Sequence, residues 1–147
     1  MAHLTVYELP DRLFILQASG IRKVTPGHAL PLDVSDHNLG ELILRLVARE
    51  LPDAPDVSEA ERREQQARIL RDSGYRTWLS LDKHAKLCGV EGDAQQLTIT
   101  PLAGKRFADR KKGFQQLSDH AVRLERPRSY TAASAVREAL KLAVGLP

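Results

Sequence analysis

The sequence predicts one α+β domain over residues 1–147, in which a twisted, mainly antiparallel sheet of five to six strands has helices packed on one face. Three observations lead to this prediction. A length of 147 residues fits a single domain. Short apolar runs bounded by turn residues recur along the chain, which is typical of strands. Two longer segments carry apolar residues at the three-and-four spacing of amphipathic helices.

The N-terminal segment predicts a hairpin followed by a short strand. Residues 3–9 and 12–18 are apolar runs separated by the turn signal Pro10-Asp11, so we expect two neighbouring strands. Residues 29–34 are expected to be extended, because Pro31 disfavours helical backbone in the residue before it.

Residues 36–50 predict the clearest helix. Ser35 or Asp36 is expected to cap it, since a side-chain oxygen there accepts a hydrogen bond from an unpaired amide of the first turn. Pro52 ends the helical pattern. The apolar face follows the helical period and consists of Leu39, Leu42, Ile43, Leu46 and Val47.

A second helix is predicted over residues 58–73. Ser58 and Glu61 have the spacing of a capping box, and Gly74 suits a left-handed C-terminal cap. We expect this helix on the surface at an edge of the sheet, because its apolar face is thin and holds only Ala60, Ala67 and Leu70.

The middle of the chain predicts two paired strands. Residues 75–81 fit either a strand or a short helix. Residues 86–90 and 96–102 read as strands joined through Gly92-Asp93. In the second of these strands the period of two separates the apolar pair from the polar pair, with Leu97 and Ile99 on one face and Thr98 and Thr100 on the other.

The C-terminal part predicts a basic loop over residues 104–113, a strand over 121–125 and a last helix over 131–144. We expect this helix and the one over 36–50 to pack on the same face of the sheet. Its buried stripe is rich in small residues, which allow close approach, and consists of Ala132, Ala135, Val136, Ala139, Leu140 and Ala143.

The composition points to a cytoplasmic protein. Cys88 is the single cysteine, so no internal disulfide can form. The N-terminal residues lack the basic and apolar regions of a signal peptide. No run approaches the roughly 18 apolar residues of a membrane span, and we expect no membrane partner.

The charge is unevenly distributed around a net value of +3. Residues 50–64 carry six acids against two arginines, whereas residues 104–128 carry eight bases against three acids. Such asymmetry concerns binding partners rather than the fold, although each segment could also be an ordinary solvated surface.

No sequence motif indicates catalysis, and we expect neither a cofactor nor a metal. The phosphate-binding, dinucleotide-binding and nucleophile-elbow patterns are absent. His84 and Cys88 are four residues apart, but the strand predicted over 86–90 removes Cys88 from any helical face shared with His84. We therefore expect a binding protein, not an enzyme.

Several features of the second half occur together in a fixed order. An aromatic-basic-Thr segment leads to a lysine-rich stretch with a cysteine, then to a strand that ends in proline, a basic and aromatic loop, and an alanine-rich helix. In this order the sequence resembles the immunity proteins of bacterial contact-dependent growth inhibition systems, abbreviated CDI. The corresponding segments are Tyr75-Arg76-Thr77, residues 83–90, residues 97–101, residues 105–114 and residues 134–140.

The resemblance implies a function that needs no chemistry. Such a protein binds the C-terminal toxin domain delivered by a neighbouring cell and blocks it in the cytoplasm. The toxins of these systems are commonly nucleases, often acting on tRNA, and nuclease sites are basic because they bind phosphates. The candidate toxin-binding residues are therefore acidic: Asp53, Asp56, Glu59, Glu61 and Glu64.

Two alternatives involve the basic segment. It could meet an acidic cluster of the toxin, because a net charge of +3 does not fit a pure nucleic-acid mimic. The chain could instead be a small nucleic-acid-binding module that uses residues 104–128, which mix bases with two phenylalanines, although we consider nucleic acid the less favoured partner. The alternative binding candidates are Lys105, Arg106, Arg110, Lys111 and Lys112.

Overall fold

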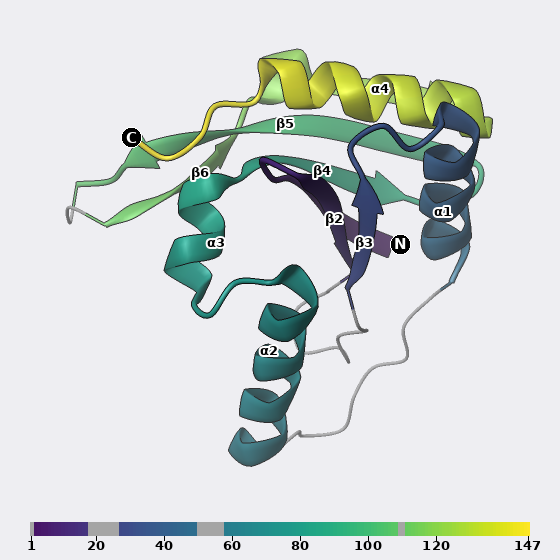
Figure 1. Ribbon diagram of the computed structural model, residues 1–147. Coiled ribbons are helices and arrows are strands. Elements are labelled where there is room, and N and C mark those ends of the chain that lie inside the picture. Colours follow the sequence, from purple (N-terminus) through teal and green to yellow (C-terminus); the bar gives the residue numbers. More distant parts are fainter. Residues whose placement is uncertain (1, 18–26, 50–57, 109–110) are drawn as a thin grey trace.

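The protein is built around one antiparallel sheet. The computed structural model describes residues 2–17, 27–49, 58–108 and 111–147. In this part of the chain the sheet has seven strands, and every pairing between them is antiparallel (Figure 1). The strands are β1 (Ala2–Glu8), β2 (Arg12–Gln17), β3 (His28–Pro31), β4 (Lys86–Gly92), β5 (Gln96–Arg106), β6 (Lys112–Gln116) and β7 (Val122–Glu125).

The strand order is β3-β2-β1-β4-β5-β6, and β7 also pairs with β5. Strand β5 is long enough to hold two partners on one side, with β7 along residues 96–99 and β6 along residues 102–106. A 3₁₀ turn, η1 (Ser118–His120), connects these two partners. The predicted hairpin of β1 and β2 is confirmed, as is the pairing of β4 with β5.

Two long helices cover one face of the sheet. Helix α1 (Asp36–Ala48) and helix α4 (Ser129–Leu142) pack against each other and against β1, β4 and β5, as predicted (Figure 1). Ser35 caps α1 by accepting a hydrogen bond from the amide of Asn38. The predicted end at Pro52 lies outside the described residues. All five predicted apolar residues of α1 are buried: Leu39, Leu42, Ile43, Leu46 and Val47.

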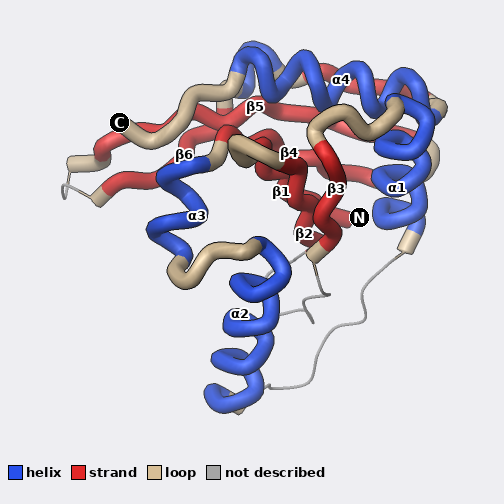
Figure 2. Tube along the Cα trace, viewed as in Figure 1, coloured by secondary structure: helices blue, strands red, loops and turns tan. Residues whose placement is uncertain are grey.

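The opposite face carries a second, smaller layer. Helix α2 (Glu59–Ser73) and helix α3 (Trp78–His84) lie on the other side of the sheet from α4, as Figure 2 shows. The segment that fitted either a strand or a helix is therefore helical from Trp78, and Thr77 caps it. This layer contains a separate apolar cluster with Tyr7, Leu9, Phe14, Leu16, Ile69, Leu81, Ala85 and Leu87.

The buried face of α2 differs from the prediction. Ala60 and Ala67 are exposed, and Ile69 is the apolar side chain that the helix buries. A single large residue on a polar helix gives too little periodic signal to identify the contact face. The C-terminal cap is confirmed, because Gly74 has a φ of 84° and its amide donates to the carbonyls of Leu70 and Arg71.

The predicted basic loop over residues 104–113 is wrong in its secondary structure. Most of this segment belongs to the β5–β6 hairpin, in which Arg106 pairs with Lys112 and Gly104 pairs with Phe114. The amide of Phe107 donates to the carbonyl of Lys111 at 2.9 Å, closing the hairpin. Basic side chains are compatible with strands when those strands are exposed, so charge alone did not identify a loop.

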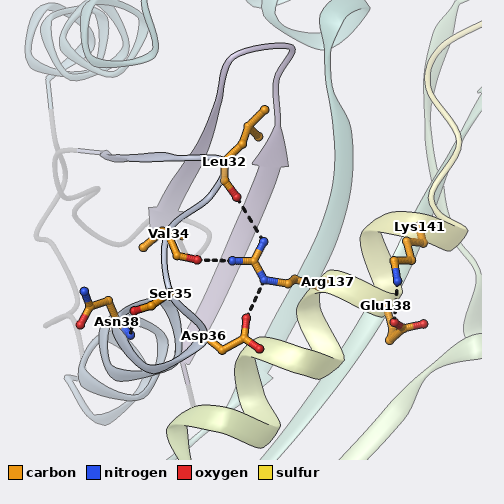
Figure 3. A network of polar contacts seen from close by, with 8 residues as sticks. All are labelled: Leu32, Val34, Ser35, Asp36, Asn38, Arg137, Glu138 and Lys141. Atoms are coloured by element: carbon orange, nitrogen blue, oxygen red, sulfur yellow. Dashed lines mark hydrogen bonds and ion pairs between the residues drawn. The ribbon is translucent and has the colours of Figure 1, made fainter.

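An arginine network joins α4 to the segment that enters α1. Arg137 donates through Nε to Asp36 Oδ1 at 2.8 Å, and its two terminal nitrogens donate to the carbonyls of Leu32 and Val34 (Figure 3). The guanidinium group thus satisfies two backbone acceptors and one carboxylate at once. This network fixes the start of α1 against α4. With these features, the predicted α+β fold class is confirmed.

Candidate binding surfaces

The predicted acidic surface lies at the beginning of α2. Glu59, Glu61 and Glu64 are exposed on this helix, whereas Asp53 and Asp56 lie outside the described residues. Glu59 forms an ion pair with Arg63 at 3.1 Å, and Glu64 forms one with Arg68 at 3.7 Å. Two of the three carboxylates therefore have a positive neighbour on their own helix.

Helix α2 as a whole is balanced in charge. It carries four acids, which are Glu59, Glu61, Glu64 and Asp72, and four arginines, which are Arg62, Arg63, Arg68 and Arg71. A polycationic surface would meet alternating signs on this helix. The acidic residues remain predicted contacts, but α2 offers a mixed surface that exposes arginines beside them.

The predicted basic surface lies on the β5–β6 hairpin. Lys105 and Arg106 end β5, Lys112 begins β6, and Lys111 precedes it, whereas Arg110 lies outside the described residues. The ammonium group of Lys105 lies 5.6 Å from the ring centroid of Phe107. The hairpin therefore brings four of the five predicted bases and an exposed aromatic ring to one tip of the sheet.

A third surface was not predicted as a site. On the sheet face that carries α2 and α3, a polar area lies beyond the apolar cluster. Its side chains come from β1, β4 and β5, alternate with buried core residues and are half-buried; we call this surface the threonine face, and it consists of His3, Thr5, Gly89, Glu91, Thr98 and Thr100.

Strand register brings these residues into two rows. Thr5 pairs with Gly89, which pairs with Thr100, while His3 pairs with Glu91, which pairs with Thr98. Arg123 of β7 extends the second row beyond Thr98. The side chains of His3 and Glu91 are each 45% exposed and contact one another at 3.1 Å, so the row is open to solvent.

The sequence predicted one strand of the threonine face. The alternation of Thr98 and Thr100 with Leu97 and Ile99 predicted a polar face on β5, and the burial of those two apolar residues confirms it. The missing information was strand order, because only the pairing of β1, β4 and β5 places Thr5 and Gly89 beside these threonines.

The thiol of Cys88 is buried and held in its neutral form. Burial, with a smaller contribution from Glu8, raises the pKa of Cys88 to about 12. The imidazole of His84 contacts its own helix and not the Cys88 thiol: its Nδ1 is 2.7 Å from the carbonyl oxygen of Ser80 in α3. Among the described residues no group of three or more His, Cys, Asp or Glu side chains could hold a metal ion.

A shallow polar depression lies between β3 and α1. Burial lowers the pKa of His28 at its rim, and the nearby Arg49 and Arg45 lower it further. The lining combines a carboxylate, a guanidinium group and an amide without an enclosed volume; the residues are Gly27, His28, Ala29, Leu30, Asn38, Glu41, Leu42 and Arg45.

None of the described helices is long and apolar enough to span a membrane.

Comparison with known proteins relates the chain to solved structures. The sequence matches no protein-family profile and no curated protein. A protein of unknown function from Neisseria meningitidis has a similar structure, with a TM-score of 0.71 and 19% identity over 96% of this chain and 94% of that one. A chain of the CdiA-CT/CdiI toxin and immunity complex from Yersinia pseudotuberculosis is also similar, with a TM-score of 0.64 and 21% identity over 95% of both chains. At these identities the likeness shows a shared fold.

Proposed function

We propose that the protein is a CDI immunity protein, which binds a cognate toxin domain and neutralises it without catalysing a reaction. The observation that carries this proposal is the likeness, over 95% of both chains, to a chain of a toxin and immunity complex. The order of motifs between Tyr75 and Leu140 supports the same family independently of the fold comparison.

The immunity role is favoured over the toxin role. The sequence segments that carry the resemblance match immunity proteins, and no catalytic motif was found among them. The buried thiol of Cys88 is held protonated, so it is a poor nucleophile. An inhibitor requires only a surface that complements its target, and the three surfaces described above provide candidates.

The toxin is proposed to be a nuclease that acts on RNA, with tRNA as the favoured substrate, in the cytoplasm of the protected cell. Titration calorimetry with the toxin domain encoded directly upstream tests the proposal. We expect one-to-one binding with a dissociation constant of about 10 nM or below, together with loss of the toxin's nuclease activity. Absence of binding would contradict the proposed function.

Charge reversal then locates the interface. A variant with Glu59→Lys, Glu61→Lys and Glu64→Lys is compared with a variant carrying Lys111→Glu and Lys112→Glu. If α2 contacts a basic toxin surface, only the first variant weakens binding, chiefly through slower association. If the hairpin contacts an acidic cluster, only the second does.

A nucleic-acid-binding module is the second candidate, because the β5–β6 hairpin combines Lys105, Arg106 and Lys112 with the exposed ring of Phe107. Phosphate binding releases counterions, so affinity for a random single-stranded RNA would fall steeply with salt. Weak RNA binding without that salt dependence would exclude this candidate.

A further inference from the structure

Gly89 occupies a strand position at which the protein's own fold does not require glycine. It lies in the middle of β4, between Thr5 of β1 and Thr100 of β5. Its φ is not in the left-handed region, unlike those of Gly74 and Gly92. A Cβ atom built at Gly89 would meet no heavy atom within 4 Å.

The other strand glycines have packing reasons. A Cβ at Gly92, Gly104 or Gly113 would come within 3 Å of another part of the chain. Glycine weakens a strand interior, because it loses more backbone entropy on folding and has no side chain to pack. Neither the packing nor the backbone conformation of the protein explains why glycine stands at position 89.

Glycine in a strand also marks places where another molecule approaches the backbone closely. Gly89 leaves its stretch of backbone without a side chain between two half-buried threonines, and the place of its missing Cβ is open. Among the described helices, α3 and α2 cover the neighbouring apolar cluster, which does not include the residues of this face.

We propose that the threonine face is the surface on which the cognate toxin domain docks, with a toxin side chain seated over Gly89. This inference rests on the proposed immunity function and names the surface that performs it. It differs from the two charge-based surfaces predicted from the sequence, since neither α2 nor the hairpin tip contributes to the threonine face.

The charges on this face favour a protein loop rich in hydrogen-bond donors. Glu91 lies in the face and Glu125 lies at its edge, where it accepts from Gln96 at 2.5 Å and pairs with Arg123 at 3.3 Å. Two carboxylates against one arginine leave this region slightly negative on a protein whose net charge is +3. Lysine, arginine or backbone amides of a nuclease surface complement it, whereas phosphates would be repelled.

Substitution of Gly89 separates docking from folding. In Gly89→Val the added Cβ meets no neighbour, and a β-branched residue suits a strand, so we expect the melting temperature to stay equal or rise. The new side chain covers the backbone at Gly89, so we expect the toxin to bind about thirtyfold more weakly or worse, as for a central interface position. Gly89→Ala, which adds one carbon, should have a smaller effect in the same direction.

The matched control is Gln115→Val, which places the same side chain at an exposed position on the opposite face of the sheet. We expect it to bind the toxin like the wild-type protein. A second variant, Glu91→Lys, removes the pair with His3 and should weaken toxin binding about tenfold or more.

The outcomes distinguish the two levels of the proposal. If the wild-type protein binds the toxin and Gly89→Val binds it equally well, the docking surface is wrong while the immunity function stands. If the wild-type protein does not bind the toxin, both are overturned. If Glu91→Lys leaves toxin binding unchanged, the threonine face does not contact the toxin and the proposal fails.

Discussion

Gly40 of α1 lies in close contact with the start of α4, and Gly40→Ala tests the packing of these helices. A Cβ atom at this position would lie 1.8 Å from the backbone oxygen of Ser129, at the start of α4. In an exposed helix interior the same substitution would stabilise the protein by about 1 kcal/mol, because alanine is the better helix former. The structure predicts the opposite sign.

The magnitude follows from the displacement that the extra carbon requires. Real Cβ atoms essentially never approach other heavy atoms more closely than 3.0 Å, so the two backbones must separate by about 1.2 Å. Overpacking of this kind costs about 3 kcal/mol when a backbone atom, which cannot rotate away, receives the clash. After the helix-propensity gain, we expect a net loss of about 2 kcal/mol and a melting temperature lower by about 6 to 10 °C.

Urea denaturation followed by circular dichroism measures this loss as a lower midpoint at an unchanged slope. Asn38→Ala is the matched control, because it lies on an exposed turn of the same helix and should be neutral or slightly stabilising. A Gly40→Ala protein as stable as the wild type would refute the close contact between α1 and α4.

Three further predictions concern buried or networked groups. Cys88 should react with a thiol reagent at pH 8 at least about a hundredfold more slowly in the folded protein than in urea, and equal rates would contradict its burial. Burial, with a smaller contribution from Asp82, raises the pKa of Tyr7 from 10.0 to about 12. The neutral phenol therefore contributes fully to the free energy of unfolding below pH 10, and this contribution is lost as the pH rises to 12. The loss due to Tyr7 is about 2 to 3 kcal/mol, and a free energy of unfolding that stays constant across this range would contradict the prediction. Arg137→Met should lower the free energy of unfolding by about 2 kcal/mol, and Arg137→Lys should not restore it, because one ammonium group cannot reproduce the fork geometry.

The sequence identified those elements whose signal is local. The capping hydroxyl of Ser35 and the helical spacing from Leu39 to Val47 both lie within α1, so no knowledge of distant residues was needed. The same holds for Gly74, where the left-handed cap follows from the residue type. Alternation along β5 was also sufficient to assign its buried and half-buried faces.

The remaining features depend on contacts between distant segments. Strand β6 carries lysine, glycine and two glutamines around a single phenylalanine, Phe114, and its pairing with β5 makes it a strand. The contact of α2 with the second apolar cluster is made by Ile69, a single buried apolar residue in a polar helix. The threonine face requires β1, β4 and β5 to be neighbours, and composition cannot reveal that order.

The central claim is that this protein neutralises a toxin by binding it. The most direct measurement adds increasing amounts of the purified protein to a fixed amount of the upstream-encoded toxin domain and follows cleavage of a tRNA substrate. The account predicts a linear fall in nuclease activity that ends at one equivalent, and an end point that Gly89→Val no longer reaches. Undiminished cleavage at a large excess of the wild-type protein would contradict the claim.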